Sequence, residues 1–223
     1  GSKVAMTKLL NYHTWYGLLS TYTTKLTDNI DFYGGIDFRA YKGTHKNEIV
    51  DLMGGDYILD PDRRDVLPAN NANANNQAWV YKKLGVGDIM YRDYDSHVIQ
   101  EGAFFQAEYN KNKLAAFVSG SLSNTTYWRY GRLYYDKDHA RSKTVSYMGF
   151  TVKGGANYNI NQYHNVFVNV GVISRAPKFA YGAFMTSTTS NVTNPNAKNE
   201  KIYSAEAGYG FKSAWLTANL NVY

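Results

Sequence analysis

The chain has 223 residues, no cysteine, 21 tyrosines and 19 glycines, with a formal net charge of +6. The lack of cysteine excludes a disulfide framework, thiolate catalysis and Cys-ligated metals. The Lys and Arg residues are scattered without a basic run, which argues against nucleic acid as a partner. Mean hydropathy is −0.47, and no run of about 18 apolar residues occurs that would form a membrane helix. A transmembrane β-barrel is still allowed, because only every second residue of its strands meets lipid.

Alternation of apolar and polar residues with a period of two predicts about eight β-strands. In chain order they are Trp15–Leu26, Asp31–Tyr41, Val98–Tyr109, Lys113–Thr125, Ser146–Ile160, Tyr163–Ser174, Glu200–Lys212 and Leu216–Val222. Each is expected to be long enough to cross a membrane, which takes about 9–11 tilted residues. The first strand alternates less cleanly than the others.

One face of these strands is rich in Val, Ala, Leu and Phe, and the other carries Asn, Ser, Gly and charged residues. We expect the apolar face to meet lipid and the polar face to meet a wet lumen. Four charged residues on the polar face are expected to form salt bridges to neighbouring strands or to a plug: Arg39, Glu108, Lys153 and Glu206. Aromatic residues near strand ends predict interfacial girdles: Tyr12, Trp15, Tyr16, Tyr41, Tyr109, Tyr127, Trp128, Tyr158 and Tyr163.

The predicted connections alternate between short turns and long polar loops. The long loops lie near Thr44–His97, Tyr127–Val145 and Ala176–Asn199. Outer-membrane barrels have short periplasmic turns and long extracellular loops, so this alternation favours an antiparallel transmembrane β-barrel. A soluble β-sandwich is the less favoured alternative, because it does not require long strands or long loops at one end.

The sequence contains no motif for catalysis or for a cofactor. The five histidines lack the spacing of a zinc site, and no nucleophile elbow is present, so we expect no enzyme activity, no metal and no cofactor. Acidic groups in the predicted loops include Asp60/Asp62/Asp65, Asp93/Asp95 and Asp136/Asp138. They are interpreted as solvated carboxylates, with a loop calcium site left open.

Several stretches resemble the barrel of TonB-dependent outer-membrane receptors, with SusC-like and carboxypeptidase-regulatory-like receptors as the nearest group. The stretches are His13–Gly43, Asp51–Tyr57, Gly87–Asp95, Lys153–Tyr158, Ser174–Pro177 and Asn199–Tyr209. The resemblance covers essentially the whole chain. It implies a barrel of about 22 strands in the cell outer membrane, filled by a plug through which the TonB complex drives uptake.

Residues 1–223 are therefore expected to form part of such a barrel, without the plug and the remaining strands. No signal-peptide pattern lies at the N-terminus, which favours an interior piece of a longer chain. The resemblance implies import of a glycan, peptide or metal chelate, with outer-membrane lipid and a surface lipoprotein lid as further partners. Two alternatives are a structural or assembly-complex barrel without transport and a small complete eight-stranded barrel.

Ligand contact is expected in the first long loop, because a loop of that length is usually functional or disordered. Aromatic faces beside charged groups suit sugars, peptides or amphipathic chelates. The candidate ligand-binding residues are Tyr57, Trp79, Tyr81, Tyr91, Arg92 and Tyr94.

Overall fold

The computed structural model describes residues 1–60, 82–133, 135, 137–185 and 191–223, and every regular element in this part of the chain is a β-strand. Eight strands form one antiparallel sheet in the order β1-β2-β5-β6-β7-β8-β9-β10, and β3 pairs with β4 separately. Their bounds are β1 Met6–Thr27, β2 Ile30–Asp51, β3 Ile58–Leu59, β4 Lys83–Leu84, β5 Ile89–Lys111, β6 Leu114–Gly131, β7 Val145–Asn159, β8 His164–Arg175, β9 Glu200–Lys212 and β10 Thr217–Val222.

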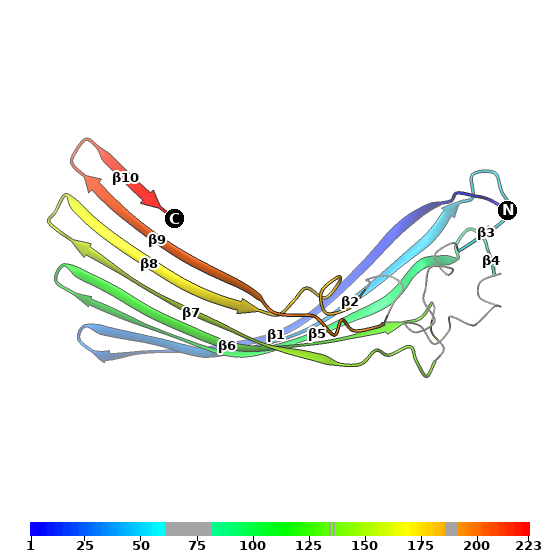
Figure 1. Ribbon diagram of the computed structural model, residues 1–223, viewed down its shortest axis with the longest axis horizontal. Helices are drawn as coiled ribbons and strands as arrows, with labels where there is room; N and C mark the ends of the chain where they lie inside the picture. Colours follow the sequence, from blue (N-terminus) through cyan, green and yellow to red (C-terminus); the bar gives the residue numbers. More distant parts are fainter. Residues whose placement is uncertain (61–81, 134, 136, 186–190) are drawn as a thin grey trace.

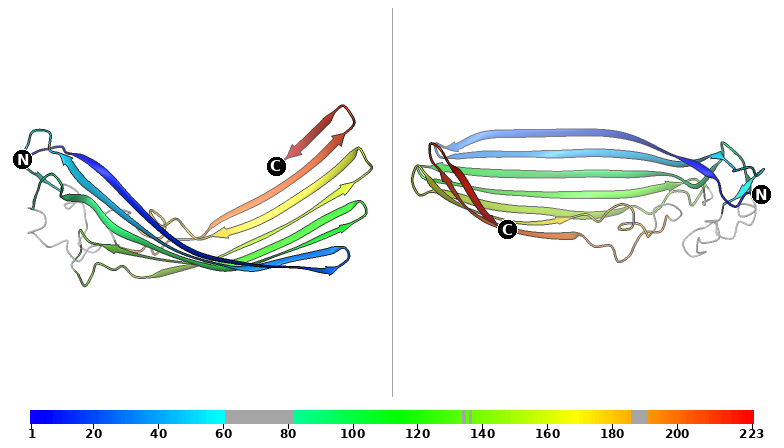
Figure 2. Two further views of the ribbon diagram at one scale, coloured as in Figure 1. Left: turned by 180° about the vertical axis from the view of Figure 1, so that it is seen from behind. Right: turned by 90° about the horizontal axis from the view of Figure 1, so that it is seen from above.

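The large sheet is curved into an open trough (Figures 1 and 2). Among the described residues, β1 and β10 each pair along one edge only, so the sheet does not close on itself. An antiparallel, all-β arrangement confirms the predicted fold class, and the open sheet fits an arc of a larger barrel. The described residues contain no helix that could cross a membrane.

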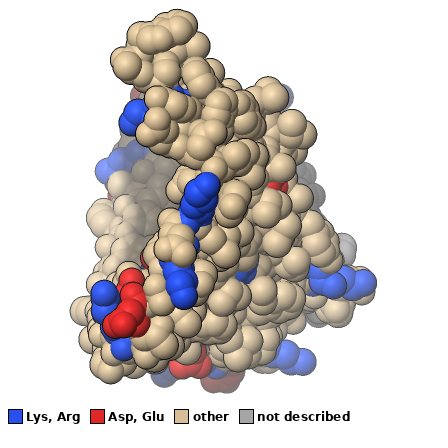
Figure 3. Space-filling view, turned by 90° about the vertical axis from the view of Figure 1, so that its left-hand side faces the viewer, with Lys and Arg blue, Asp and Glu red and all other residues tan. Residues whose placement is uncertain are grey.

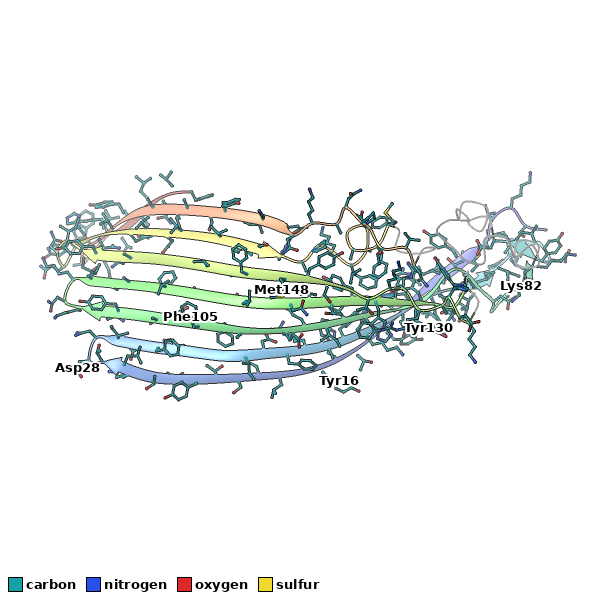
Figure 4. All side chains as sticks on the ribbon, turned by 60° about the horizontal axis from the view of Figure 1, so that its bottom comes forward. Tyr16, Asp28, Lys82, Phe105, Tyr130 and Met148 are labelled. Carbon is teal, nitrogen blue, oxygen red and sulfur yellow. The ribbon has the colours of Figure 1, made fainter. Side chains whose placement is uncertain are left out.

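The strand register places the apolar residues of successive strands on one face, here called the outer face. Directly opposed residues of an antiparallel pair point to the same side of the sheet. One continuous row across β2, β5, β6 and β7 is Ile36, Ala103, Leu122 and Phe150. Figure 4 views the molecule with its convex side forward and labels Tyr16, Phe105 and Met148, which belong to this face. The outer face therefore has the apolar surface that lipid requires.

The opposite face, here called the inner face, is polar along most of its length. A row across β5 to β9 consists of Gln106, Ser119, Lys153, Gly171 and Ser204. This row suits a hydrated lumen, as the alternation predicted.

The apolar band of the outer face has the height of a membrane. On β6 it runs from Ala116, opposite Tyr109, to Trp128, opposite His97, and the polar residues Asn124 and Thr126 interrupt it near the loop end. The twelve steps from residue 116 to residue 128, at about 3.3 Å each, span about 40 Å along the strand, or about 30 Å across the membrane at a typical barrel tilt. One acidic exception lies within the band near its loop end, where Glu101 accepts a hydrogen bond from Asn124 Nδ2 at 3.3 Å.

The predicted aromatic girdles are only partly on the outer face. Register places Tyr12, Tyr16, Tyr109, Trp128 and Tyr158 there. In contrast, Trp15, Tyr41 and Tyr127 lie on the inner face, with the rings of Trp15 and Tyr41 4.5 Å apart. Position near a strand end does not determine the face, because neighbouring residues point to opposite sides.

The strands extend further into the predicted long loops than expected. Residues 44–51 belong to β2 and residues 89–97 to β5, so the first long connection comprises residues 52–88. The second is likewise shorter, residues 132–144, while the third, residues 176–199, agrees with the prediction. The strand extensions lie above the apolar band, where neither face needs apolar residues, so the period-two signal fades although the backbone ladder continues.

The opposite end of the sheet has only short turns. Asp28 and Asn29 join β1 to β2, and Asn112 adopts a positive φ of 53° in the two-residue turn between β5 and β6. Asn tolerates this left-handed conformation better than most residues. Figure 3 looks onto this end and shows Lys, Arg, Asp and Glu scattered among uncharged residues.

The four charged residues predicted to bridge strands behave differently from one another. Arg39 pairs with Asp37 of its own strand at 2.6 Å and not with a neighbouring strand, and a bridge to a plug stays a prediction. Glu108 accepts a hydrogen bond from Gln106 of its own strand, and Glu206 is 3.5 Å from Asn169 Nδ2 on β8. No ion pair of Lys153 occurs among the described residues.

Candidate functional site

The base of the first long connection is packed above the loop end of the sheet. Five buried apolar residues form this small core: Ile49, Leu52, Ile58, Leu84 and Met90. The β3–β4 pair joins residues 58–59 to residues 83–84 and so brings the two ends of the first long connection together. Tyr57 lies beside this pair, with the Lys83 ammonium 4.4 Å from the centre of its ring. The described ends of the loop are therefore anchored to the barrel wall.

Tyr91 has a strained backbone at the edge of this core. Its φ is +67°, which is uncommon for a residue with a bulky side chain. The register between β2 and β5 shifts here, because Glu48 pairs with Ile89 and Lys46 with Asp93. The Tyr91 N–H donates to Asp60 Oδ2 at 2.9 Å, so a residue of the first long connection stabilises this β-bulge. Bulges and positive-φ residues of this kind recur next to binding sites.

The inner face just below contains a cluster of aromatic and cationic side chains, here called the inner cluster: His45, Arg92, Tyr94 and Arg129. Tyr94 is only 4% exposed, and the Arg129 guanidinium lies 3.9 Å from the centre of its ring. The rings of His45 and Tyr94 are 5.0 Å apart. Arg92 lies 5.6 Å from the Tyr94 ring and 3.4 Å from Asn11 Oδ1. Tyr94 therefore connects the cluster across β2, β5 and β6.

His45 is held as a neutral imidazole. Its Nδ1 lies 2.7 Å from Asn11 Oδ1, an acceptor, so Nδ1 carries the proton; Nε2 lies 3.4 Å from Ser96 Oγ. Burial, together with the charges of Arg92, His13 and Arg129, lowers the pKa of His45 to about 4. The inner cluster thus has its positive charge on two arginines at neutral pH.

A second histidine continues the cluster along β1. The rings of His13 and His45 are 5.8 Å apart, and His13 Nδ1 is 2.7 Å from Tyr41 Oη. Among the described residues, no group of three or more His, Cys, Asp or Glu side chains is arranged to hold a metal ion.

On the outer face at the same height, an ionic cluster joins β2, β5 and β6. The Arg132 guanidinium donates to both carboxylate oxygens of Asp95 at 2.9 Å and to Asp93 Oδ1 at 2.9 Å. Thr44 Oγ1 also donates to Asp95, at 2.7 Å. These bonds outweigh burial and hold the pKa of Asp95 well below its usual range. The interpretation of Asp93 and Asp95 as solvated loop carboxylates is therefore wrong, because both lie in β5 and are ion-paired.

The other two long connections pack together over the inner face. Ala183 and Phe184 are buried against Tyr127, and Tyr127 Oη donates to the Pro177 carbonyl at 3.0 Å. Asn191 joins the two connections, since its Nδ2 donates to the Ala140 carbonyl at 2.7 Å and its N–H to Tyr135 Oη at 2.6 Å. In Figure 1 this part of the β8–β9 connection lies on the concave side of the sheet. It therefore covers part of the inner face near Tyr127.

Three of the six predicted site residues come together, and they do so on a strand instead of in a loop. Tyr91, Arg92 and Tyr94 belong to β5, and Tyr57 lies apart, beside Lys83. Trp79 and Tyr81 lie outside the described residues. The sequence interpretation did not identify His45, Asn11 or Arg129 as their neighbours, because those residues reach β5 only through the pairing of β1, β2 and β6.

The arrangement is suited to recognition. Two arginines, aromatic edges and amide groups at the loop end of the inner face can bind the oxygen atoms and apolar faces of a polar ligand. Tyr91 and Arg92 are only partly buried, whereas Tyr94 and Arg129 are buried and support them.

Comparison with known families agrees with this geometry. The family described as TonB dependent receptor-like, beta-barrel, matches residues 6–223, almost the entire chain. Comparison with curated proteins and with solved structures gives no match. Members of this family are receptors and transporters of the outer membrane and not a class of enzymes. The chain belongs to the TonB-dependent receptor-like β-barrel family.

Proposed function

We propose that residues 1–223 form part of a TonB-dependent outer-membrane transporter that binds a nutrient at its long connections and imports it into the periplasm. The observation that carries this proposal is the asymmetry of the two ends. One end has turns of a few residues, and the other has three long connections whose described residues pack in two small cores at the loop end of the sheet. Ligand recognition concentrates in loops held on a rigid scaffold, so the long connections face the outside in this proposal.

The nutrient is a glycan, a peptide or a metal chelate. The residues that contact it are Tyr57, Trp79, Tyr81, Tyr91 and Arg92, and Tyr94 supports them. The complete barrel has about 22 strands and contains a plug that the TonB complex engages. A surface lipoprotein covering the mouth is a further partner, and the SusC-like subtype is part of the proposal.

Growth of a deletion strain on defined iron, glycan and peptide sources tests the function. We expect loss of growth on one source, restored by the full-length gene and also lost when TonB is inactivated. Full-length protein with Arg92→Ala and Tyr91→Ala together should bind that nutrient at least tenfold more weakly. A matched Lys111→Ala variant at the turn end should bind normally. Unchanged growth on every source, with a stable co-purifying protein partner, would favour a structural barrel instead.

A further inference from the structure

A continuous series of five aromatic rings, here called the aromatic stripe, runs along the inner face from the inner cluster away from the loop end. The ring centres of successive members are 5.0, 5.8, 5.8 and 4.5 Å apart in the order Tyr94, His45, His13, Tyr41 and Trp15. The stripe crosses three adjacent strands, because its members belong to β5, β2 and β1. Rings in contact at this spacing form one apolar surface with polar edges.

Gly43 allows the middle of the stripe to form. It lies between Tyr41 and His45 on β2 and is directly opposite His13 on β1. A Cβ at Gly43 would be 2.8 Å from Tyr41 Cζ, so the Tyr41 side chain occupies the space above the glycine. In this position Tyr41 Oη is 2.7 Å from His13 Nδ1, and the two rings are parallel within 22°. The Tyr41 ring therefore lies along the wall and connects the two ends of the stripe.

Exposure increases along the stripe with distance from the loop end. Tyr94 is 4% exposed, His45 and Tyr41 are partly buried, and Trp15 is 64% exposed. Tyr94 therefore anchors the series on the wall, and Trp15 is the ring most available to a molecule at the inner face. The next residue of β1, Tyr16, is 71% exposed on the outer face and is labelled in Figure 4.

Uncharged polar groups lie beside the rings. Asn11 is directly opposite His45, and Asn11 Oδ1 is the acceptor in its contacts with His45 Nδ1 and Arg92 Nη2. No described residue accepts a hydrogen bond from Asn11 Nδ2, so this donor is available to a ligand. Ser96 Oγ and Tyr41 Oη add hydroxyl groups on the neighbouring strands. The stripe therefore combines ring faces with amide and hydroxyl groups.

Cationic groups lie only at the two ends of the stripe. Arg92 and Arg129 lie at the loop end, around the Tyr94 ring. Arg39 lies just beyond the other end and donates to both carboxylate oxygens of Asp37, at 3.0 and 2.6 Å. Its charge is therefore compensated within the wall, and the length of the stripe between these ends presents no cation other than a protonated imidazole.

This pattern distinguishes between the classes of nutrient. A chelate with several anionic groups requires cations along its length. A peptide recognised through its backbone requires the free edge of a strand, whereas the stripe presents ring faces. A linear chain of pyranose rings has apolar C–H faces and a rim of hydroxyl groups, which match the rings and the polar groups beside them.

The length of the stripe fits a short chain of such rings. From His45 to Tyr41 it covers four residues of β2, or about 13 Å at the rise of a β-strand. A chain of three linked pyranose rings is of this length.

We propose that the aromatic stripe binds a neutral linear oligosaccharide lengthwise, with one end at the inner cluster and the third unit on Trp15. The inference rests on the proposed function, because the sugar reaches the stripe from the side of the long connections. Trp15 and Tyr41 contact the sugar faces, and Gly43 is a positioning residue that acts through Tyr41. Each unit adds one contact, so affinity increases with chain length until the stripe is filled.

The test applies full-length protein in detergent to an array of neutral and acidic oligosaccharides of one to six units. Isothermal titration calorimetry then measures the affinity of each member of the series that binds best. We expect neutral linear chains to bind, with an affinity that increases up to the third unit and is constant beyond it. Trp15→Ala should remove the gain of the third unit, about three- to tenfold, and leave the two-unit chain nearly unchanged. Trp15→Phe should retain most of that gain.

Tyr16→Ala is the matched control. Tyr16 adjoins Trp15 and is similarly exposed but lies on the outer face, so this variant should bind every chain as the wild type does. Gly43→Ala displaces the Tyr41 ring without removing any aromatic residue, and it should weaken binding of both the two-unit and the three-unit chain. The midpoint of thermal unfolding of each variant confirms that it is folded.

Three outcomes would overturn the proposal: no oligosaccharide on the array binds, affinity does not depend on chain length, or Trp15→Ala and Tyr16→Ala have equal effects. The growth experiment keeps this inference separate from the proposed function. TonB-dependent growth on an iron or peptide source, without oligosaccharide binding, would overturn the inference and leave transport intact. Oligosaccharide binding without any growth defect of the deletion strain would overturn transport and leave the aromatic stripe as a binding site.

Discussion

The guanidinium of Arg132 binds both oxygens of the Asp95 carboxylate at 2.9 Å, joining the loop end of β6 to β5. The Asp95 side chain is 9% exposed and also accepts from Thr44. Bidentate pairs of this kind fix geometry as well as charge. The pair lies where the strands leave the apolar band. It therefore fixes β5 and β6 relative to each other outside the membrane.

Replacing Arg132 with methionine should loosen this end of the sheet. Asp95 would keep Thr44 and Lys42 but lose two hydrogen bonds, at a cost of about 2–3 kcal/mol in the free energy of local opening. Hydrogen exchange of amides 93–96 and 129–132 in the full-length protein measures this. Arg175→Met is the matched control, because its pair with Glu200 is 60% and 38% exposed and should contribute less than about 1 kcal/mol. Equal effects of the two variants would contradict the proposed role of Asp95.

The same pair predicts an acid dependence with a defined sign. The pKa of Asp95 is lower in the folded protein than in the unfolded chain, so its stabilisation is complete above the unfolded value of about 4 and is lost as pH falls through the folded value. We expect the protection factors of amides 93–96, measured relative to the intrinsic exchange rate at each pH, to be independent of Asp95 above pH 5 and to fall below pH 4. Asp95→Asn should remove this fall.

His45 predicts a second transition in a different pH range. Its folded pKa is about 4, below the unfolded value of about 6.5, so the unfolded state takes up the proton first as pH falls. Local stability near His45 is therefore complete above pH 6.5 and declines by up to about 3 kcal/mol on acidification to pH 4. Exchange at amides 45–49 should show this decline, and His45→Gln should flatten it. A decline of equal size in the variant would assign the transition to another group.

The sequence was sufficient to predict the strands that cross the membrane but not the clusters at their loop ends. Between Ala103 and Tyr109 the alternation is strong because lipid and lumen demand opposite side chains. Above the band this demand disappears, so Thr44–Asp51 and Ile89–His97 could not be recognised as strand. Tyr91 and Arg92 were predicted from local composition. Their partners Asn11 and His45 lie far away in sequence and depend on register, which a single sequence does not specify.

The connection between Asn191 and Ala140 predicts that the second and third long connections are protected together. Asn191 is 8% exposed, and its side chain and N–H bond to carbonyl and hydroxyl oxygens of the β6–β7 connection. Asn191→Ala removes the side-chain bonds and should increase cleavage by added protease in both connections by about five- to tenfold, a cost of about 1 kcal/mol or more. Lys198→Ala, at an exposed position of the same connection, should leave both rates unchanged. Faster cleavage confined to residues 176–199 would show that the two connections are not coupled.

Adjacent glycines of β7 offer a matched test of how the inner wall is packed. Gly155 is directly opposite Phe117, and a Cβ at Gly155 would lie 2.7 Å from the Phe117 ring and 2.9 Å from the Val168 carbonyl oxygen, with Asn169 closer still. A Cβ at Gly154, on the outer face, would have only the Phe117 carbonyl oxygen nearby, at 3.5 Å. The Phe117 ring can move but the Val168 backbone cannot, so Gly155→Ala should destabilise the folded barrel by about 1–3 kcal/mol. Gly154→Ala should be neutral or slightly stabilising, because it reduces the freedom of the unfolded chain. The denaturant midpoint of the full-length protein in lipid vesicles measures both. A cost at Gly154 as large as that at Gly155 would show that membrane contact, and not the aromatic ring over the glycine, limits side-chain size on this strand.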